Sequence, residues 1–206
     1  MSAGLRIGDW IWTSTGRQFW PRDPRPSDFC IEDIAMGGAK EPRFAGQTLG
    51  FVTYSVAQHE VLCCEEAARR LVPPAHWLPF PDEWERVKRV ILRAVLVHDG
   101  AEGLGWKDLP APVKHDPAMA AYRAGESRCK EALFDWACVG SERRHPIIKE
   151  VDVALRRTEQ RDLQLPIPPH LLAVKARCEP LSQRIVPWTA EEAYRRFLAK
   201  WEEVKP

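Results

Sequence analysis

The sequence lacks the features that mark membrane-spanning, secreted and polymer-binding proteins. No apolar run approaches the length needed to cross a bilayer, and the first ten residues contain no signal-peptide core. Lysine and arginine number 30 against 29 aspartate and glutamate residues, so no excess of positive charge favours a nucleic-acid polymer or an anionic membrane as partner. We therefore expect a soluble cytoplasmic protein, for which a small anionic substrate remains open.

The sequence also has no CxxC spacing among its six cysteines, and Cys63 and Cys64 are adjacent within a helical pattern. Reduced, partly buried thiols are therefore favoured over disulfides or a thiolate zinc site. No internal repeat or linker divides the 206 residues, a length that fits one domain. We expect a single domain over 1–206.

Hydrophobic periodicity predicts a mainly α-helical bundle with a small β-hairpin near the N-terminus. Residues 1–50 are expected to be loop-rich, with two short strands within 10–20 and a short helix that Asp28 could cap. A helical core is expected over 51–163, with helices at 54–71, 81–98, 117–137 and 146–163. An irregular segment should begin the remaining part, 164–206, which ends in a helix opened by Thr189.

Three of the expected helices each carry an ionisable residue on the apolar face. His59 lies on the same face of its expected helix as Val56 and Cys63, a stripe of inward-facing positions. His98 continues such a stripe at the end of the next helix. Asp152 lies on a stripe that ends at Glu159. An unpaired buried carboxylate is costly, so Asp152 needs a cation or several donors nearby. A hydrogen-bonded core histidine and a carboxylate paired with an arginine are the alternatives when each residue is taken alone.

Asp99 follows His98 directly at the expected end of a helix, where we expect Gly100, Gly103 and Gly105 to free the backbone. Two imidazoles and two carboxylates suit a divalent transition metal and leave room for water and substrate. The sequence therefore predicts one metal site made of His59, His98, Asp99 and Asp152, and with it a metal-dependent hydrolase.

Further charged residues flank these predicted ligands. Glu102 lies four residues after His98, where it can act as a general acid or base or remain a solvated helix-end glutamate. Asp108 can orient water or a sugar hydroxyl, or cap a loop. Arg43, Lys114 and Lys149 are candidates for phosphate contacts, although each alone is more often a surface charge.

These segments resemble the HD-domain phosphohydrolase superfamily, in which the order His, His-Asp, Asp lies on helices. The closer resemblance is to its branch of small nucleotide-directed proteins, which includes bacterial 5′-deoxynucleotidases and phage dATP triphosphohydrolases. The matching segments are RFAGQT at 43–48, YSVAQH at 54–59, HDGAE at 98–102, DLPAPVK at 108–114 and KEVD at 149–152. The resemblance extends from about Trp10 to the C-terminal helix.

The resemblance implies an all-helical HD fold and hydrolysis of a deoxynucleotide phosphoester with a divalent cofactor. The expected ion is Zn, Co, Mn or Ni, and an additional Mg²⁺ is compatible with it. Matched residue by residue, the family pattern implies metal ligands at His59, His98, Asp99 and Asp152. It implies catalytic acids at Glu102 and Asp108. It implies substrate contacts at Arg43, Phe44, Lys114 and Lys149.

Three departures from the family pattern limit what carries over. One extra residue separates Glu102 from Asp108, which weakens the role implied for Asp108. Ala45 and Gly46 leave space where a bulky residue could select a base, so no base preference is implied. The N-terminal segment through Ile34 is longer than in the smallest members and can cover the site or build an oligomer.

The expected reaction is attack of an activated water on phosphorus, with Glu102 managing protons. A deoxynucleoside monophosphate or triphosphate is the expected substrate, and a homo-oligomer, dimer or hexamer, is the expected assembly. Two other functions stay open: a metal- and nucleotide-binding regulatory module without turnover, and a cyclic-nucleotide phosphodiesterase.

Overall fold

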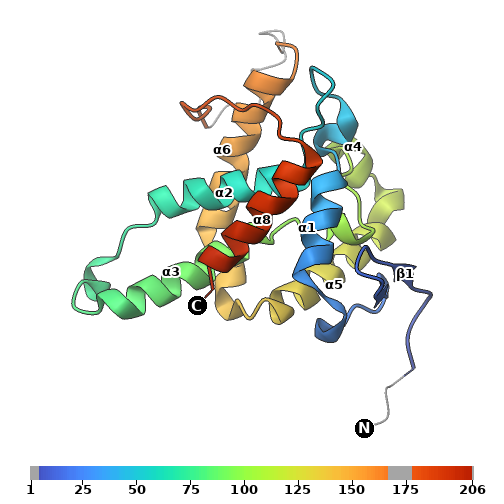
Figure 1. Ribbon diagram of the computed structural model, residues 1–206, viewed down its shortest axis with the longest axis horizontal. Helices are drawn as coiled ribbons and strands as arrows, with labels where there is room; N and C mark the ends of the chain where they lie inside the picture. Colours follow the sequence, from blue (N-terminus) through green and yellow to red (C-terminus); the bar gives the residue numbers. More distant parts are fainter. Residues whose placement is uncertain (1–4, 167–177, 206) are drawn as a thin grey trace.

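A two-stranded hairpin near the N-terminus leads into a bundle of α-helices (Figure 1). The computed structural model describes residues 5–166 and 178–205. Strand β1 (Ile11–Trp12) pairs antiparallel with β2 (Gln18–Phe19), with Ile11 opposite Phe19. The mainly helical fold with a small N-terminal hairpin is therefore confirmed.

Apart from a short helix at 111–114, where a loop was expected, the helices lie close to their expected positions. They are α1 (Ile31–Lys40), α2 (Val56–Arg70), α3 (Pro81–Leu96), α4 (Ala111–Lys114), α5 (Ala120–Trp136), α6 (Pro146–Leu163) and α8 (Ala190–Glu203). Short 3-10 helices join them: η1 (Pro26–Asp28), η2 (Arg43–Gly46), η3 (Ala75–Trp77), η4 (Glu102–Leu104), η5 (Pro117–Met119) and η6 (Gly140–Arg144). Among the described residues, no helix is both long and apolar enough to span a membrane. The irregular segment expected from residue 164 falls partly on 167–177, outside the described residues.

The ends of the helices follow from local side-chain chemistry. The Ser55 hydroxyl accepts a hydrogen bond from the Gln58 amide at the start of α2, and Thr189 accepts one from the Glu192 amide at the start of α8. The expected cap at Asp28 is wrong. Helix α1 begins after Cys30 without a side-chain cap, because the Asp28 carboxylate is buried and binds Arg6 instead.

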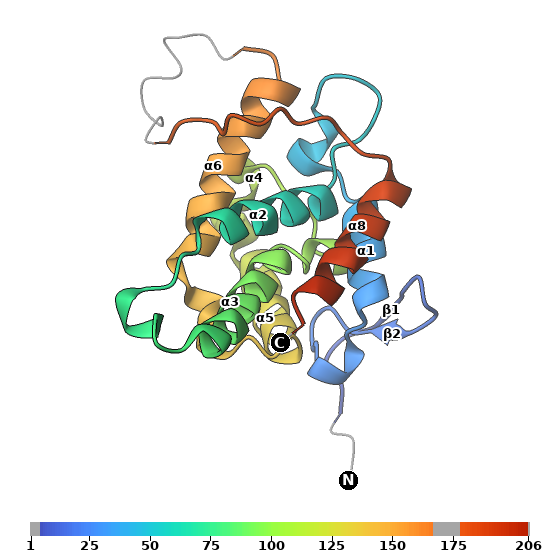
Figure 2. The ribbon, with the colours of Figure 1, turned by 60° about the vertical axis from the view of Figure 1, so that its left-hand side comes forward.

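Helix α2 lies at the centre of the bundle and packs against α3, α6 and α8. Figures 1 and 2 both show α8 running beside α1, so the C-terminal helix packs against the first helix of the chain. The buried apolar side chains form one cluster that extends along the chain from Phe19 to Val204. Burying each large aliphatic side chain in such a core contributes about 1.5–3 kcal/mol.

Helix α1 touches η4 through two glycines. A Cβ atom on Gly37 would stand 1.9 Å from the carbonyl oxygen of Gly103, so the two backbones are in direct contact. Gly100 is also tightly packed, with Leu133 and Ile34 at 3.0 and 3.1 Å from the Cβ it lacks. The expectation that these glycines free the backbone is therefore wrong for Gly100 and Gly103, which allow close packing. It holds for Gly105, which adopts a left-handed φ of 98°.

Candidate metal centre

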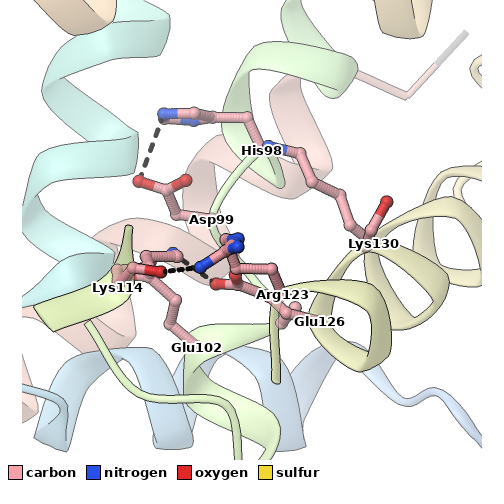
Figure 3. Close-up of a pocket in the computed structure, with 9 residues that line it drawn as sticks. His98, Asp99, Glu102, Lys114, Arg123, Glu126 and Lys130 are labelled. Atoms are coloured by element: carbon pink, nitrogen blue, oxygen red, sulfur yellow. Dashed lines mark hydrogen bonds and ion pairs between the residues drawn. The ribbon is translucent and has the colours of Figure 1, made fainter. Parts of the chain in front are cut away.

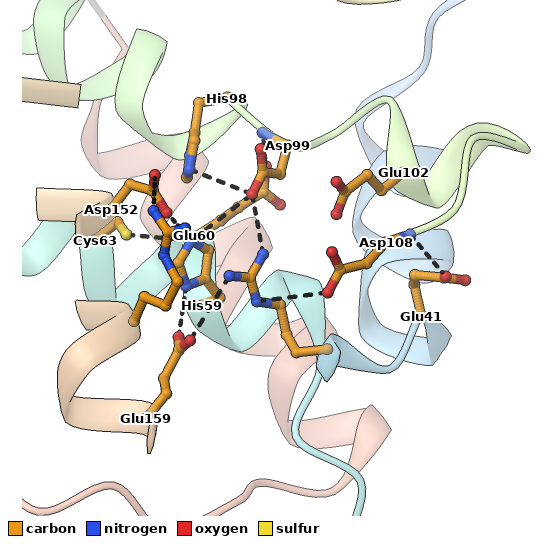
Figure 4. Close-up of polar contacts among 12 residues, drawn as sticks. Glu41, His59, Glu60, Cys63, His98, Asp99, Glu102, Asp108, Asp152 and Glu159 are labelled. Carbon is orange, nitrogen blue, oxygen red and sulfur yellow. Dashed lines mark hydrogen bonds and ion pairs between the residues drawn. The ribbon is translucent and has the colours of Figure 1, made fainter. Parts of the chain in front are cut away.

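The four predicted metal ligands converge from three helices (Figure 4). His59 lies on α2, His98 and Asp99 follow α3 closely, and Asp152 lies on α6. The His59 Nε2 atom lies 3.7 Å from Asp99 Oδ2 and 3.8 Å from Asp152 Oδ1, and His98 Nε2 lies 3.4 Å from Asp99 Oδ2. Residues from distant parts of the chain thus present nitrogen and oxygen donors to one small volume.

These separations fit a single cation. Two adjacent donors that each lie about 2.1 Å from one ion are about 3.0–3.5 Å apart, and the observed distances are at or slightly above that range. His98 Nε2 is buried and has no hydrogen-bond partner among the described residues. Its Nδ1 lies 2.8 Å from the Val95 carbonyl and donates to it, which leaves the Nε2 lone pair facing the other donors. The donor set present therefore suits a divalent metal ion.

A buried carboxylate on α6 orients His59. Glu159 Oε1 lies 2.6 Å from His59 Nδ1 and also accepts a hydrogen bond of 2.7 Å from the Tyr54 hydroxyl. The Nδ1 proton is thereby fixed, so Nε2 faces Asp99 and Asp152 with its lone pair. Metal-binding histidines commonly donate their second ring nitrogen to a carboxylate in this way, which sets the tautomer and raises ligand basicity.

A second buried glutamate supports Asp99. The Glu60 carboxylate accepts a hydrogen bond of 3.0 Å from the Asp99 backbone amide. Burial, and then the charge of Asp99, raises the pKa of Glu60 well above its usual range. Glu60 therefore holds the chain after α3 in place.

The predicted ligands carry the charges that a cation requires. Burial lowers the pKa of His98 and keeps its imidazole neutral. Burial alone would raise the pKa values of the two aspartates. Electrostatic interactions with neighbouring groups, His98 first and then the Lys130 ammonium, nevertheless hold the pKa of Asp99 far below its usual range, and interactions with His59 and His98 lower that of Asp152 to about 2. Neutral imidazoles and ionised carboxylates are the forms that bind a metal.

Arg43 is buried among the acidic groups. Its guanidinium donates to Asp99 Oδ2 at 3.1 Å and lies 3.6 Å from Glu159 and 3.9 Å from Asp108. The Asp108 carboxylate in turn accepts a hydrogen bond of 3.1 Å from the Phe44 amide. Arg43 thus reaches the donor cluster, whereas Asp108 contacts the turn that carries Arg43.

The η2 turn is held in an unusual conformation. Phe44 and Ala45 have φ values of 56° and 52°, in the left-handed region that non-glycine residues rarely adopt. Two backbone hydrogen bonds close the base of the loop: the Arg43 amide donates to the Tyr54 carbonyl, and the Val56 amide donates to the Glu41 carbonyl. The chain therefore fixes the position of Arg43 at the expense of local strain.

A cavity of about 190 Å³ opens beside the predicted ligands (Figure 3). It is lined by His98, Asp99, Ala101, Glu102, Lys114, Arg123, Glu126, Ser127 and Lys130. The predicted contact Lys114 lies in it, 2.5 Å from Glu126 and 3.6 Å from Glu102. Lys149 does not line this cavity: its side chain is largely exposed and pairs with Asp152 at 2.8 Å. Phe44 does not line it either.

Lys130 is a cation of the cavity whose ammonium is not held by another side chain. Figure 3 shows it reaching from α5 toward the end of α3 that carries His98. Within the described part of the chain it forms no hydrogen bond or ion pair, and its ammonium lies 5.8 Å from the centre of the Phe134 ring. Arg123, by contrast, donates to the backbone carbonyls of Lys114 and Asp116. Lys130 is therefore the cation most available to an anionic ligand.

Glu102 is buried at the junction between the cavity and the ligands. Its Oε2 atom has no hydrogen-bond partner among the described residues. Burial, followed by the charges of Asp99 and Asp108, raises the pKa of Glu102 well above its usual range. A carboxyl group with a raised pKa that faces a polar cavity is suited to donate a proton to a leaving group.

Cys63 brings a sulfur atom to the same donors. It lies one turn after His59 on α2, with its Sγ 3.5 Å from His59 Nε2. The donor atoms of His59, Cys63 and His98 all lie within 4.8 Å of one another, and all three residues are buried. Burial raises the pKa of the Cys63 thiol well above its usual range.

Four residues near the ligands were not predicted from the sequence: Glu60, Cys63, Lys130 and Glu159. Two of them carried a signal, because Cys63 shares the stripe of His59 and Glu159 shares the stripe of Asp152. Glu60 adjoins a predicted ligand but has no distinguishing spacing. Nothing in the local sequence separates Lys130 from the other surface cations.

Comparison with known proteins identifies relatives without stating an activity. No family model matches the chain. It is 31% identical over 155 residues to the uncharacterized protein YfdR of Escherichia coli (strain K12), a match that covers 75% of this chain and 72% of YfdR. It is 47% identical over 106 residues to an uncharacterized protein of Rhodobacter capsulatus, a match that covers 51% of this chain but only 46% of that protein. The HD-domain resemblance stays a prediction.

Proposed function

The chain belongs to the family of YfdR, and since that name states no activity, we propose a function from the site itself: metal-dependent hydrolysis of a phosphoester in a deoxynucleotide. The convergence of His59, His98, Asp99 and Asp152 is the observation that carries the proposal. A divalent ion held by these residues would polarise a phosphoryl oxygen and lower the pKa of a water molecule. A cytoplasmic location and a homo-oligomeric assembly stay predictions.

The chain's own residues supply the rest of the chemistry. Glu102, which faces the cavity and whose pKa is raised by burial, would give a proton to the leaving oxygen. Arg43 and Lys114 would balance the negative charge that grows on the phosphoryl oxygens as the bond to the leaving group lengthens. Glu159 would keep the His59 ring in one tautomer throughout.

The size and polarity of the cavity support a phosphate group as its occupant. At about 190 Å³ it is smaller than the roughly 300–1,000 Å³ of pockets that enclose whole drug-sized ligands. It therefore suits part of a nucleotide, and the Lys130 ammonium, which pairs with no acidic group among the described residues, favours the phosphates over the base. Monophosphate and triphosphate substrates both remain within the proposal.

A substrate panel tests the proposed activity. Purified protein would be freed of metal, then supplied with Mn²⁺, Co²⁺, Zn²⁺ or Mg²⁺ and incubated with deoxynucleoside mono- and triphosphates and with cyclic nucleotides. We expect metal-dependent release of phosphate or triphosphate from at least one deoxynucleotide. Thermal stabilisation by nucleotides without any product would contradict hydrolysis and favour a binding module.

Lys130→Met tests the assignment of the cavity to phosphate. Loss of one charge-assisted contact should lower kcat/KM about 10–100-fold, mainly through KM, which corresponds to about 1.4–2.8 kcal/mol. Arg128→Met removes a neighbouring exposed cation from the same helix, outside the cavity, and is the matched control. Equal effects of the two substitutions on kcat/KM would show that only the general charge of α5 matters.

A further inference from the structure

Cys63 occupies the position of an additional donor in the centre formed by His59, His98, Asp99 and Asp152. Two adjacent ligands of one ion, a sulfur at about 2.3 Å and a nitrogen at about 2.1 Å, are about 3.1–3.8 Å apart when the angle at the metal is about 90–120°, as in a five-coordinate site. The observed distance from Cys63 Sγ to His59 Nε2 is 3.5 Å. Independently, His98 Nε2 is buried, has no hydrogen-bond partner among the described residues, and lies within 4.8 Å of the other two donors.

We propose that Cys63 is a ligand of the metal ion, and that its sulfur makes the centre select Zn²⁺ or Co²⁺ over Mn²⁺ and Mg²⁺. The inference rests on the metal site of the proposed function and goes further, because it names a fifth donor and the class of metal. Thiolate ligands select softer ions, whereas carboxylate and water ligands suit Mg²⁺ and Mn²⁺. It also reverses the expectation from the sequence that a thiolate metal site is disfavoured.

The coordination step balances through one proton. The Cys63 Sγ–H bond breaks as the sulfur–metal bond forms, the electron pair stays on sulfur, and the proton leaves to solvent. No oxidant or reductant takes part. Binding of the ion should therefore release one more proton from the wild-type protein than from a variant without this thiol.

The alternative role of Cys63 is packing. A buried thiol one turn from a histidine can simply fill space and donate weakly to the ring nitrogen. Cys64 provides the comparison, because it is equally buried but points elsewhere, with its Sγ 3.5 Å from the Leu92 carbonyl oxygen. Any effect of buried thiols in general should appear in both residues.

Cobalt absorption spectroscopy separates these roles. Metal-free wild-type protein, Cys63→Ser, Cys63→Ala and Cys64→Ser would be titrated with Co²⁺ and then with competing Zn²⁺ and Mn²⁺. The weak visible d–d bands report that the ion is bound, whereas an intense near-ultraviolet charge-transfer band reports a sulfur ligand. Proton release would be followed with a pH indicator in the same titration.

We expect wild type and Cys64→Ser to show both kinds of band. Both Cys63 variants should keep the d–d bands, lose the charge-transfer band, and show at least about a tenfold smaller preference for Zn²⁺ over Mn²⁺. Wild type with d–d bands but no charge-transfer band would overturn the role of Cys63 while leaving the metal site intact, even if the variants do not fold. Absence of all cobalt bands would overturn the metal site itself, and the role of Cys63 with it.

Discussion

Asp99→Ala should reduce hydrolysis at least about 1,000-fold while the protein remains folded. Asp99 is the carboxylate that approaches the Nε2 atoms of both imidazoles, at 3.4 Å from His98 and 3.7 Å from His59. Removing it takes away one of two anionic donors and the partner of Arg43. A loss of about 4 kcal/mol of transition-state stabilisation corresponds to that factor, and charge stabilisation by a bound ion reaches several kcal/mol.

Metal content and circular dichroism should be measured on the same samples. The bound metal per chain should fall sharply in Asp99→Ala, and the helical signal should not change. Asp135→Ala is the matched control, because it removes an exposed aspartate paired with Arg143 on the far part of α5. Wild-type activity in a folded Asp99→Ala protein would falsify the proposed mechanism.

Gly37→Ala should destabilise the fold by at least about 3 kcal/mol. The added Cβ would meet the Gly103 carbonyl oxygen at 1.9 Å, which real structures do not tolerate, so α1 and η4 have to separate. Overpacking in a core costs about 1–3 kcal/mol, and a clash with backbone belongs at the upper end or beyond. Because η4 begins at Glu102, the same shift should displace the proposed general acid.

Gly38→Ala is the matched control for this prediction. It lies next along the same helix, but its Cβ would meet Ala57 at an ordinary 3.4–3.5 Å. Replacing a helix-interior glycine with alanine contributes up to about 1 kcal/mol of stability, so this variant should be neutral or slightly more stable. Urea unfolding of the two variants should therefore give changes of opposite sign or very different size. Equal free energies of unfolding for Gly37→Ala and Gly38→Ala would show that α1 and η4 can move apart without a loss of stability.

Helix positions and the inward direction of the predicted ligands were accessible from the sequence because both depend on local spacing. The stripe of Asp152 and the stripe of His59 each point into the bundle, as expected. The contact of Glu159 with His59 was not accessible, since it depends on how α6 crosses α2. Sequence spacing places a residue on a face of its own helix but does not say which residue of another helix it meets.

The glycines after His98 illustrate the same limit. Three glycines in six residues suggest a loose chain when only the local sequence is considered. The structure instead packs Gly103 against α1, and this depends on Gly37, which lies far away in the sequence. Lys130 was missed for a related reason: only the folded arrangement of α5 makes it a neighbour of His98.

The closed base of the loop between Arg43 and Tyr54 has a consequence for how relatives can diverge. Hydrogen bonds at 43–54 and 41–56 close the base of the loop, and the tip exposes Phe51 fully to solvent. Insertions or substitutions at the tip can therefore accumulate over evolution without moving the guanidinium of Arg43. The tip is a region in which descendants of one ancestral protein can acquire different surfaces while keeping the same chemistry.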